Sequence, residues 1–269
     1  MGIKSASEID WLKDSQSFDK VSDLYDQYRP SYPAELIENI LTMSGIPARG
    51  QILEIGSGTG IATQLFAERG FRIHCVEPGK NLAQVAAQKL RGFPDVSFEH
   101  VRFEDWQEHA GRFDLVISAQ AFHWVNGAVG YPKTARTLKP NGQLALFWNM
   151  YPGIAGAIGV DLERVYRERV PEGERLYEPL GPEELIKYRA AAINASSCFG
   201  RVRIKRFPWS VRYNCQQYLG LLNTYSDHLR LSEQTRQSLF EGVAEVIERH
   251  GGFIERPYLT VLYVARKLG

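Results

Sequence analysis

At residues 52–60 the chain reads Ile52-Leu53-Glu54-Ile55-Gly56-Ser57-Gly58-Thr59-Gly60, a short apolar run followed by a turn with three glycines. The apolar run predicts a buried strand. The glycines let the following backbone approach a ligand closely or take a positive φ angle. Glu77 follows a second expected strand, 21 residues after Gly56, where an acidic side chain can accept hydrogen bonds from both hydroxyls of a ribose. Together these features predict a nucleoside-containing cofactor at the carboxyl ends of the strands.

The glycine turn lacks the patterns that bind a diphosphate. A dinucleotide fingerprint needs G-x-G-x-x-G or G-x-G-x-x-A, so that the diphosphate rests on a helix N-terminus. The last position of that pattern is Ile61 when counted from Gly56 and Thr63 when counted from Gly58, and no Lys follows Gly60 as a P-loop requires. The residues therefore favour a nucleoside without a diphosphate, and a nicotinamide dehydrogenase stays open as a less favoured alternative.

Short apolar runs alternate with segments of helix-forming composition from residue 51 onward. Strands are expected at 52–55, 73–76, 96–98, 115–118 and 144–148, and helices at 59–70, 80–91 and 127–139. Two later strands, at 202–213 and 258–267, are expected to form a terminal antiparallel pair. The alternation predicts an α/β fold with a doubly wound, seven-stranded, mostly parallel sheet.

The length of 269 residues fits a single domain, 1–269, with insertions. Its expected parts are an N-terminal helical cap (1–44), a cofactor-binding core (45–150) and helical insertions that cover the site as a lid (151–201 and 214–257). Apolar residues in 8–28 have helical spacing. A second helix is expected to begin near Pro33 and to end at Gly45.

Composition excludes several other classes of protein. Thirty-two Lys and Arg balance 31 Asp and Glu, so there is no long-range field to gather nucleic acid or an anionic membrane. Three cysteines without metal-ligand spacing predict neither a disulfide framework nor a metal site, and a cytoplasmic location is expected. No secretory signal and no apolar run of about 20 residues is present. The basic residues of 201–206 alternate with Val202 and Ile204, which favours an exposed edge strand over a nucleic-acid patch.

Several further motifs occur in the order seen in one enzyme family. They are Tyr28-Arg29-Pro30-Ser31-Tyr32-Pro33, Phe103-Glu104-Asp105-Trp106, Phe113-Asp114-Leu115-Val116, Ala119-Gln120-Ala121-Phe122-His123-Trp124 and Leu138-Lys139-Pro140-Asn141-Gly142. With E-x-G-x-G-x-G at 54–60, they resemble the class I S-adenosylmethionine-dependent methyltransferases. The resemblance covers residues 25–150 and extends to the small-molecule branch, which includes trans-aconitate and ubiquinone- or menaquinone-pathway methyltransferases. It implies S-adenosylmethionine as the cofactor, which carries a nucleoside but no phosphate.

The resemblance also implies roles for individual residues. The cofactor would be bound by Arg29, Glu54, Gly56, Ser57, Gly58, Gly60, Glu77, Phe103, Glu104 and Gln120. The acceptor would be contacted by Tyr25, Tyr28, His123, Trp124 and Trp148, with Tyr225 added from the lid. Glu77 would hold the ribose, and Phe103 with Glu104 would border the adenine. Many relatives carry Asp immediately before Phe103, whereas this chain has Arg102, which has no acceptor for an adenine amino group.

Methyl transfer requires a nucleophile held in line with the donor at about 3–3.5 Å, with water excluded. His123 is the expected catalytic residue, as a general base, because its ordinary pKa lies near neutrality. The leading hypothesis is a methyltransferase for a small acidic or isoprenoid-like molecule, with no nucleic-acid or membrane partner. The alternatives are a methyltransferase acting on protein or RNA, and a non-catalytic protein that binds S-adenosylmethionine. The residues predict neither the acceptor's identity nor the oligomeric state.

Overall fold

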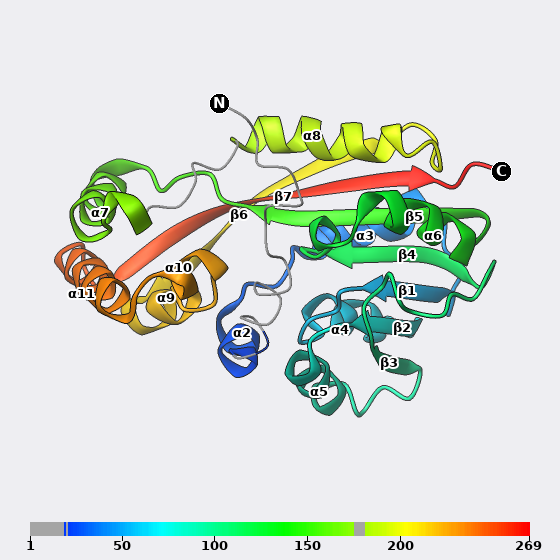
Figure 1. The fold of residues 1–269 in the computed structure, drawn as a ribbon, viewed down its shortest axis with the longest axis horizontal. Helices are drawn as coiled ribbons and strands as arrows, with labels where there is room; N and C mark the ends of the chain where they lie inside the picture. Colours follow the sequence, from blue (N-terminus) through cyan, green and yellow to red (C-terminus); the bar gives the residue numbers. More distant parts are fainter. Residues whose placement is uncertain (1–18, 20, 175–180) are drawn as a thin grey trace.

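The computed structural model describes Asp19, residues 21–174 and residues 181–269. Within these residues seven strands form one sheet in the order β3-β2-β1-β4-β5-β7-β6 (Figure 1). The strands are β1 (Gln51–Ile55), β2 (Arg72–Glu77), β3 (Val96–His100), β4 (Phe113–Ala119), β5 (Leu138–Met150), β6 (Arg203–Asn214) and β7 (Phe253–Arg266). Strands β1 to β5 pair in parallel, and β7 lies antiparallel between β5 and β6. The predicted fold class is therefore confirmed.

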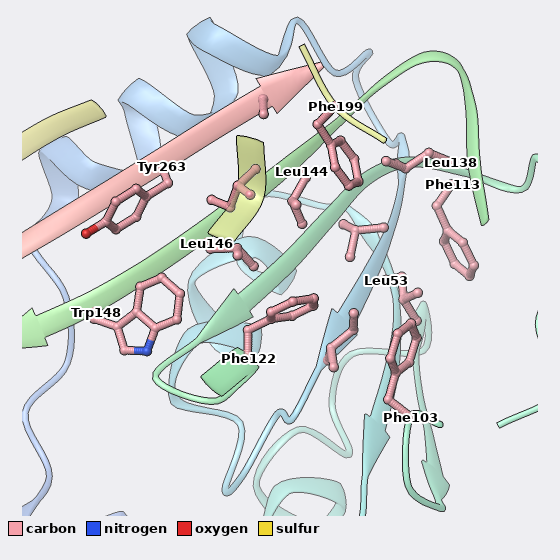
Figure 2. Packing of buried hydrophobic residues seen from close by; sticks show 14 of the residues in the cluster. Leu53, Phe103, Phe113, Phe122, Leu138, Leu144, Leu146, Trp148, Phe199 and Tyr263 are labelled. Carbon is pink, nitrogen blue, oxygen red and sulfur yellow. The ribbon is translucent and has the colours of Figure 1, made fainter. Parts of the chain in front are cut away.

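The central strands are buried on both faces. Alternate side chains of β5 enter two different apolar clusters: Leu144, Leu146 and Trp148 on one face, Ala145 and Phe147 on the other. Figure 2 shows the first of these clusters, in which Phe122, Phe199 and Tyr263 pack around the β5 side chains. A strand covered on both faces reads as a continuous apolar run. This burial is why residues 144–148 predict a strand without any alternation of polar residues.

Helices cover both faces of the sheet. Helices α3 (Ala34–Ser44) and α4 (Ile61–Ala67) pack on the face that holds Phe147. The opposite face is covered by η1 (Phe122–Trp124), α6 (Gly127–Thr137) and α8 (Pro182–Ala195), whereas α5 (Lys80–Lys89) packs along β2 and β3. Helix α3 follows Pro33 and ends at Gly45, whose φ angle is 60°, as the sequence predicts.

Strands β6 and β7 extend beyond the rest of the sheet. Pairing of β7 with β5 ends at Leu259, whereas its pairing with β6 continues back to Phe253. Four helices surround this extension, α7 (Gly156–Arg169), α9 (Cys215–Leu222), α10 (Ser226–Arg230) and α11 (Glu233–Arg249), while the short η2 (Glu172–Glu174) follows α7 (Figure 1). They enclose a third apolar cluster that includes Tyr258. The expected start of the last strand at 258 is corrected to Phe253, because β6 pairs with the whole of β7.

Several smaller predictions can be compared with the structure. Strand β6 is an edge strand as expected, and its basic residues contact both neighbouring layers: Arg203 donates to the carbonyl of Met43 and Arg206 pairs with Glu183. The three cysteines are free. Among the described residues no cluster of His, Cys, Asp or Glu could hold a metal ion, and no helix is long and apolar enough to cross a membrane. Of the segment 8–28, the described part forms α2 (Ser22–Tyr28), and residues 8–18 lie outside the described part.

Glu54 is a carboxyl group buried between β1 and α4. Its Oε2 accepts a hydrogen bond from the hydroxyl of Thr63 at 2.6 Å, and its Oε1 has no partner. Burial, opposed by that bond and reinforced by the charge of Glu77, raises the pKa of Glu54 to about 8. The folded protein therefore favours the neutral, protonated form of this side chain.

This burial makes stability depend on pH. Because the pKa of Glu54 in the folded protein, about 8, lies above its ordinary value of 4.5, the contribution of Glu54 to stability is complete below pH 4.5 and is lost as pH rises through 8. The loss is about 1.4 kcal/mol per pH unit inside this window. We expect Glu54→Gln to remove this dependence. The free energy of unfolding of the variant, relative to that of the wild type, should therefore be higher at pH 8 than at pH 5. Urea unfolding at both pH values measures this, with the exposed Glu68→Gln as the control. An equal difference at both pH values would contradict it.

Candidate active site

A cavity of about 580 Å³ lies at the carboxyl ends of β1, β2, β4 and β5. Sites for small molecules typically occupy about 300–1,000 Å³. The predicted site residues that line it are Tyr25, Arg29, Gly56, Ser57, Gly58, Glu77, Phe103, Glu104, Gln120, His123, Trp124, Trp148 and Tyr225. Residues far apart in the chain thus line the same cavity. The N-terminal segment, the turns after the strands, helix α8 and the residues before α10 all reach it.

Three predicted site residues lie outside the cavity lining. Tyr28 packs against α9, where a Cβ at Gly220 would come within 2.5 Å of its ring. Glu54 faces Thr63 behind the glycine turn. Gly60 precedes α4 with a φ angle of 76°, and a Cβ there would lie 2.9 Å from the Leu90 side chain. These three residues shape the elements that carry the site.

The turns after β1 and β4 touch at the floor of the cavity. Gly56 has a φ angle of 70°, and a Cβ on it would lie 2.4 Å from the Cβ of Ala121. Gln120 also has a positive φ, 59°, and is held by a backbone bond to the Phe147 carbonyl and a side-chain bond to the Asn149 carbonyl. Non-glycine residues fixed in this region are strained and concentrate at functional sites. Gln120 is such a residue, and it lines the cavity.

Glu77 connects the turns after β1 and β2. Its Oε2 accepts the backbone N–H of Gly58 at 2.7 Å, and its Oε1 accepts that of Gly79 at 2.8 Å. The side chain is 5% exposed and still reaches the cavity. Burial raises the pKa of Glu77 to about 7, against the lowering effect of the two N–H groups. Each carboxylate oxygen keeps a further lone pair that can accept a hydroxyl.

Arg29 joins the N-terminal segment to the lid. Its Nε donates to the hydroxyl of Thr224 at 2.8 Å, and its Nη2 donates to the carbonyl of the same residue at 2.6 Å. The guanidinium lies between the rings of Tyr25 and Tyr225, 4.9 Å and 4.1 Å from their centroids. These contacts hold a positive charge in the cavity wall.

His123, Trp148 and Arg189 form a second connected group of lining residues. The indole N–H of Trp148 donates to His123 Nδ1 at 3.1 Å, and the Arg189 guanidinium lies 4.1 Å from the centre of the Trp148 ring. Desolvation by the surrounding protein, together with the charge of Arg189, lowers the pKa of His123 to about 3. The ring is therefore neutral near pH 7, and its proton is on Nε2 because Nδ1 is an acceptor.

The end of the cavity near β3 is formed by a connected set of polar and aromatic residues. Phe103 is buried, and Glu104 accepts the backbone N–H of Asn126 at 3.0 Å. Arg102, the residue that departs from the family pattern, lines the cavity and lies 3.6 Å from Glu104 in an ion pair. Arg102 is thus directed to a carboxylate of the protein.

Several lining residues were not predicted from the sequence, among them Tyr32, Tyr151, Leu185 and Arg189. For Arg189 a signal was present in the helical spacing. It follows Ile186 by three residues and precedes Ile193 by four, and both isoleucines are buried. A charged residue on the apolar stripe of a helix indicates a special environment.

Comparison with known proteins finds similarity to methyltransferases. A family model described as a methyltransferase domain matches residues 52–142. An uncharacterized methyltransferase of Mycobacterium tuberculosis is 26% identical over 254 residues, which cover 92% of this chain and 94% of that protein. An uncharacterized methyltransferase-like protein of Schizosaccharomyces pombe is 27% identical over 82% of each chain.

Solved structures show the same fold. A methyltransferase of Anaeromyxobacter dehalogenans superposes with a TM-score of 0.64 at 20% identity, covering 89% of this chain and 98% of that one. A phosphoethanolamine N-methyltransferase of Haemonchus contortus, solved with S-adenosylhomocysteine, gives 0.55 at 16% identity, covering 97% of this chain and 60% of that one. The sheet order and these structures show the fold of the class I methyltransferases, and the matched domain and the curated relatives support an S-adenosylmethionine-dependent methyltransferase.

Proposed function

We propose that this chain transfers a methyl group from S-adenosylmethionine to a small-molecule acceptor. The observation that supports the small acceptor is the size of the cavity and the number of segments that line it. Its walls come from the strand ends, from α8 and from the segments around Arg29 and Tyr225, and its volume is about 580 Å³. A space of this size admits a cofactor and a small molecule. A protein or RNA acceptor would have to insert a single side chain or an extruded base into it.

The residues around the cavity fit the cofactor, which supplies an electrophilic methyl group on a sulfonium. Glu77 has lone pairs left for ribose hydroxyls after accepting two backbone N–H groups. Gly56 and Gly58 give a turn without side chains, which lets a ligand lie against the backbone. Arg29 is a fixed cation for the carboxylate of the methionine part.

The remaining assignments follow from position. Phe103 and Glu104 would border the adenine, and Ser57 and Gln120 would line the methionine end, since all four reach the cavity. Trp124, Trp148, Tyr25 and Tyr225 would enclose the acceptor. Such walls hold the reactants in place and exclude water, which are the main contributions a protein makes to a displacement reaction.

His123 takes a different role from the one expected from the sequence. Its Nδ1 already accepts a hydrogen bond from Trp148, and its pKa is lowered to about 3 by desolvation and by Arg189. A general base needs a free lone pair and a pKa near the working pH. We therefore assign to His123 hydrogen-bond donation from Nε2 to the acceptor, in place of proton removal.

The cofactor assignment predicts the effect of changing Glu77. At pH 8 we expect Glu77→Ala to weaken S-adenosylhomocysteine binding about 10–100-fold, because two charge-assisted hydrogen bonds at about 1.5–3 kcal/mol each are only partly replaced by water. Because the pKa of Glu77 is about 7, wild-type affinity should also fall as pH is lowered below that value, whereas Glu77→Gln should show no such fall. Isothermal titration measures both, with the exposed Glu68→Ala as the control. Unchanged affinity in Glu77→Ala would remove the ribose assignment.

The tautomer of His123 can be observed directly. We expect the ¹⁵N shifts of its ring at pH 7 to be those of the neutral form protonated at Nε2, with no titration above pH 5. Assignment is made by comparison with His123→Gln, and the exposed His100 is the internal reference. A titration midpoint between pH 6 and pH 7 would restore the general-base role.

The class of acceptor can be tested without knowing its identity. The protein is incubated with a whole cell extract and S-adenosylmethionine that carries a labelled methyl group, and the mixture is then separated by ultrafiltration. We expect the label to appear in the metabolite fraction. The Glu77→Ala variant at the same limiting cofactor concentration should transfer less, because it binds the cofactor more weakly. Label found on protein or RNA would contradict the small-molecule assignment.

A further inference from the structure

Arg189 is a cation in the cavity wall that has no anionic partner among the described residues. It lies on α8, lines the cavity, and stacks on Trp148 at 4.1 Å from the ring centre. Its Nη1 is buried without a hydrogen bond of ordinary geometry, and the neutral hydroxyl of Tyr263 is the neighbouring polar group that favours its charged form. In the described part of the chain no Asp or Glu forms an ion pair with it. Burial of a guanidinium under these conditions is unfavourable, and burial accordingly lowers the pKa of Arg189.

The other cavity arginines already have assigned contacts. Arg102 lies in an ion pair with Glu104, and Arg29 donates twice to Thr224. In the proposed function Arg29 also meets the carboxylate of the cofactor. Among the three arginines in the cavity lining, Arg189 is thus the one to which no anionic group has been assigned.

The net charge of the cavity also favours an anionic ligand. Among the described lining residues the charged side chains are three arginines, Arg29, Arg102 and Arg189, and two glutamates, Glu77 and Glu104. His123 is neutral, and bound S-adenosylmethionine adds a net positive charge. Inside a low-dielectric site such an excess favours a ligand of negative charge. The neighbours of Arg189 in the lining, Trp148 and Leu185, are apolar or aromatic, which suits an apolar body attached to that charge.

We propose that Arg189 binds a carboxylate of the methyl acceptor, and that the acceptor is therefore a small organic acid with an apolar body. A guanidinium matches a carboxylate with two parallel N–H donors, and Arg189 has Nη1 free to give one of them. His123, which adjoins Trp148, supplies a further donor from Nε2. The inference rests on the proposed function, because it names the acceptor class for the same cavity.

The test compares acids with amides of the same shape. The probes are benzoate, phenylacetate, cinnamate and octanoate, each with its amide, titrated in the presence of saturating S-adenosylhomocysteine and followed by tryptophan fluorescence and calorimetry. We expect the wild type to bind at least one acid about 10-fold or more tightly than its amide, which corresponds to about 1.4 kcal/mol. No preference in any pair would overturn the inference.

Variants of α8 assign the preference to one side chain. Arg189→Met should bind acid and amide equally, and Arg189→Lys should keep part of the preference, because the ammonium retains the charge without the planar fork. Lys187→Met, on the exposed face of the same helix, removes one charge and should behave as the wild type. Persistence of the full preference in Arg189→Met would overturn the assignment to Arg189.

Cofactor binding distinguishes a failure of the proposed function from a failure of the inference about Arg189. All variants of α8 should keep wild-type affinity for S-adenosylhomocysteine and a similar melting temperature. Failure of the wild type to bind S-adenosylhomocysteine would overturn the proposed function. Normal cofactor binding without a preference for acids would overturn the acid acceptor and the role of Arg189, and would leave the cofactor assignment in place.

Discussion

The carboxylate of Glu77 holds together the two turns that form the cofactor end of the cavity. It accepts the N–H of Gly58 after β1 and that of Gly79 after β2, so the ends of two adjacent parallel strands are fixed relative to each other. Burying this carboxylate is costly, and the two N–H groups offset only part of the cost, since its pKa stays raised to about 7. Ligand hydroxyls that donate to the same oxygens would supply the stabilisation that the protein leaves incomplete.

The cofactor half of the site could be predicted from the sequence because its determinants are local. A strand, a glycine turn and an acid after the next strand follow one another along the chain, and the backbone geometry of parallel strands brings them together. The structure gives Gly56 and Gly58 the positive φ angles that the glycines suggest. The environment of His123 was not predictable in this way. Its Nδ1 accepts a hydrogen bond from Trp148 of β5, a contact that only the folded structure creates.

The acceptor half was less predictable because its walls come from distant segments. Arg29 and Thr224 are 195 residues apart, yet their two hydrogen bonds fasten the N-terminal segment to the lid. The aromatic rings of Tyr25 and Tyr225 enclose the same guanidinium. No sequence motif predicts such contacts, because they depend on how α2 and α9 pack. The boundary of β7 was missed for a related reason: its first residues pair only with β6, outside the main sheet.

In the proposed function, the arrangement of charge would let one cavity accept two different ligands without a dedicated base. Arg29 and Arg189 both line the cavity, one held by hydroxyl, carbonyl and tyrosine contacts and the other stacked on the Trp148 ring. A carboxylate that meets Arg189 would lose its hydration but regain charge-assisted hydrogen bonds. A neutral ligand of the same shape would leave the guanidinium unpaired. Discrimination then arises from the unfavourable state of the unpaired arginine as much as from the attraction itself, which is how buried polar groups reject incomplete ligands.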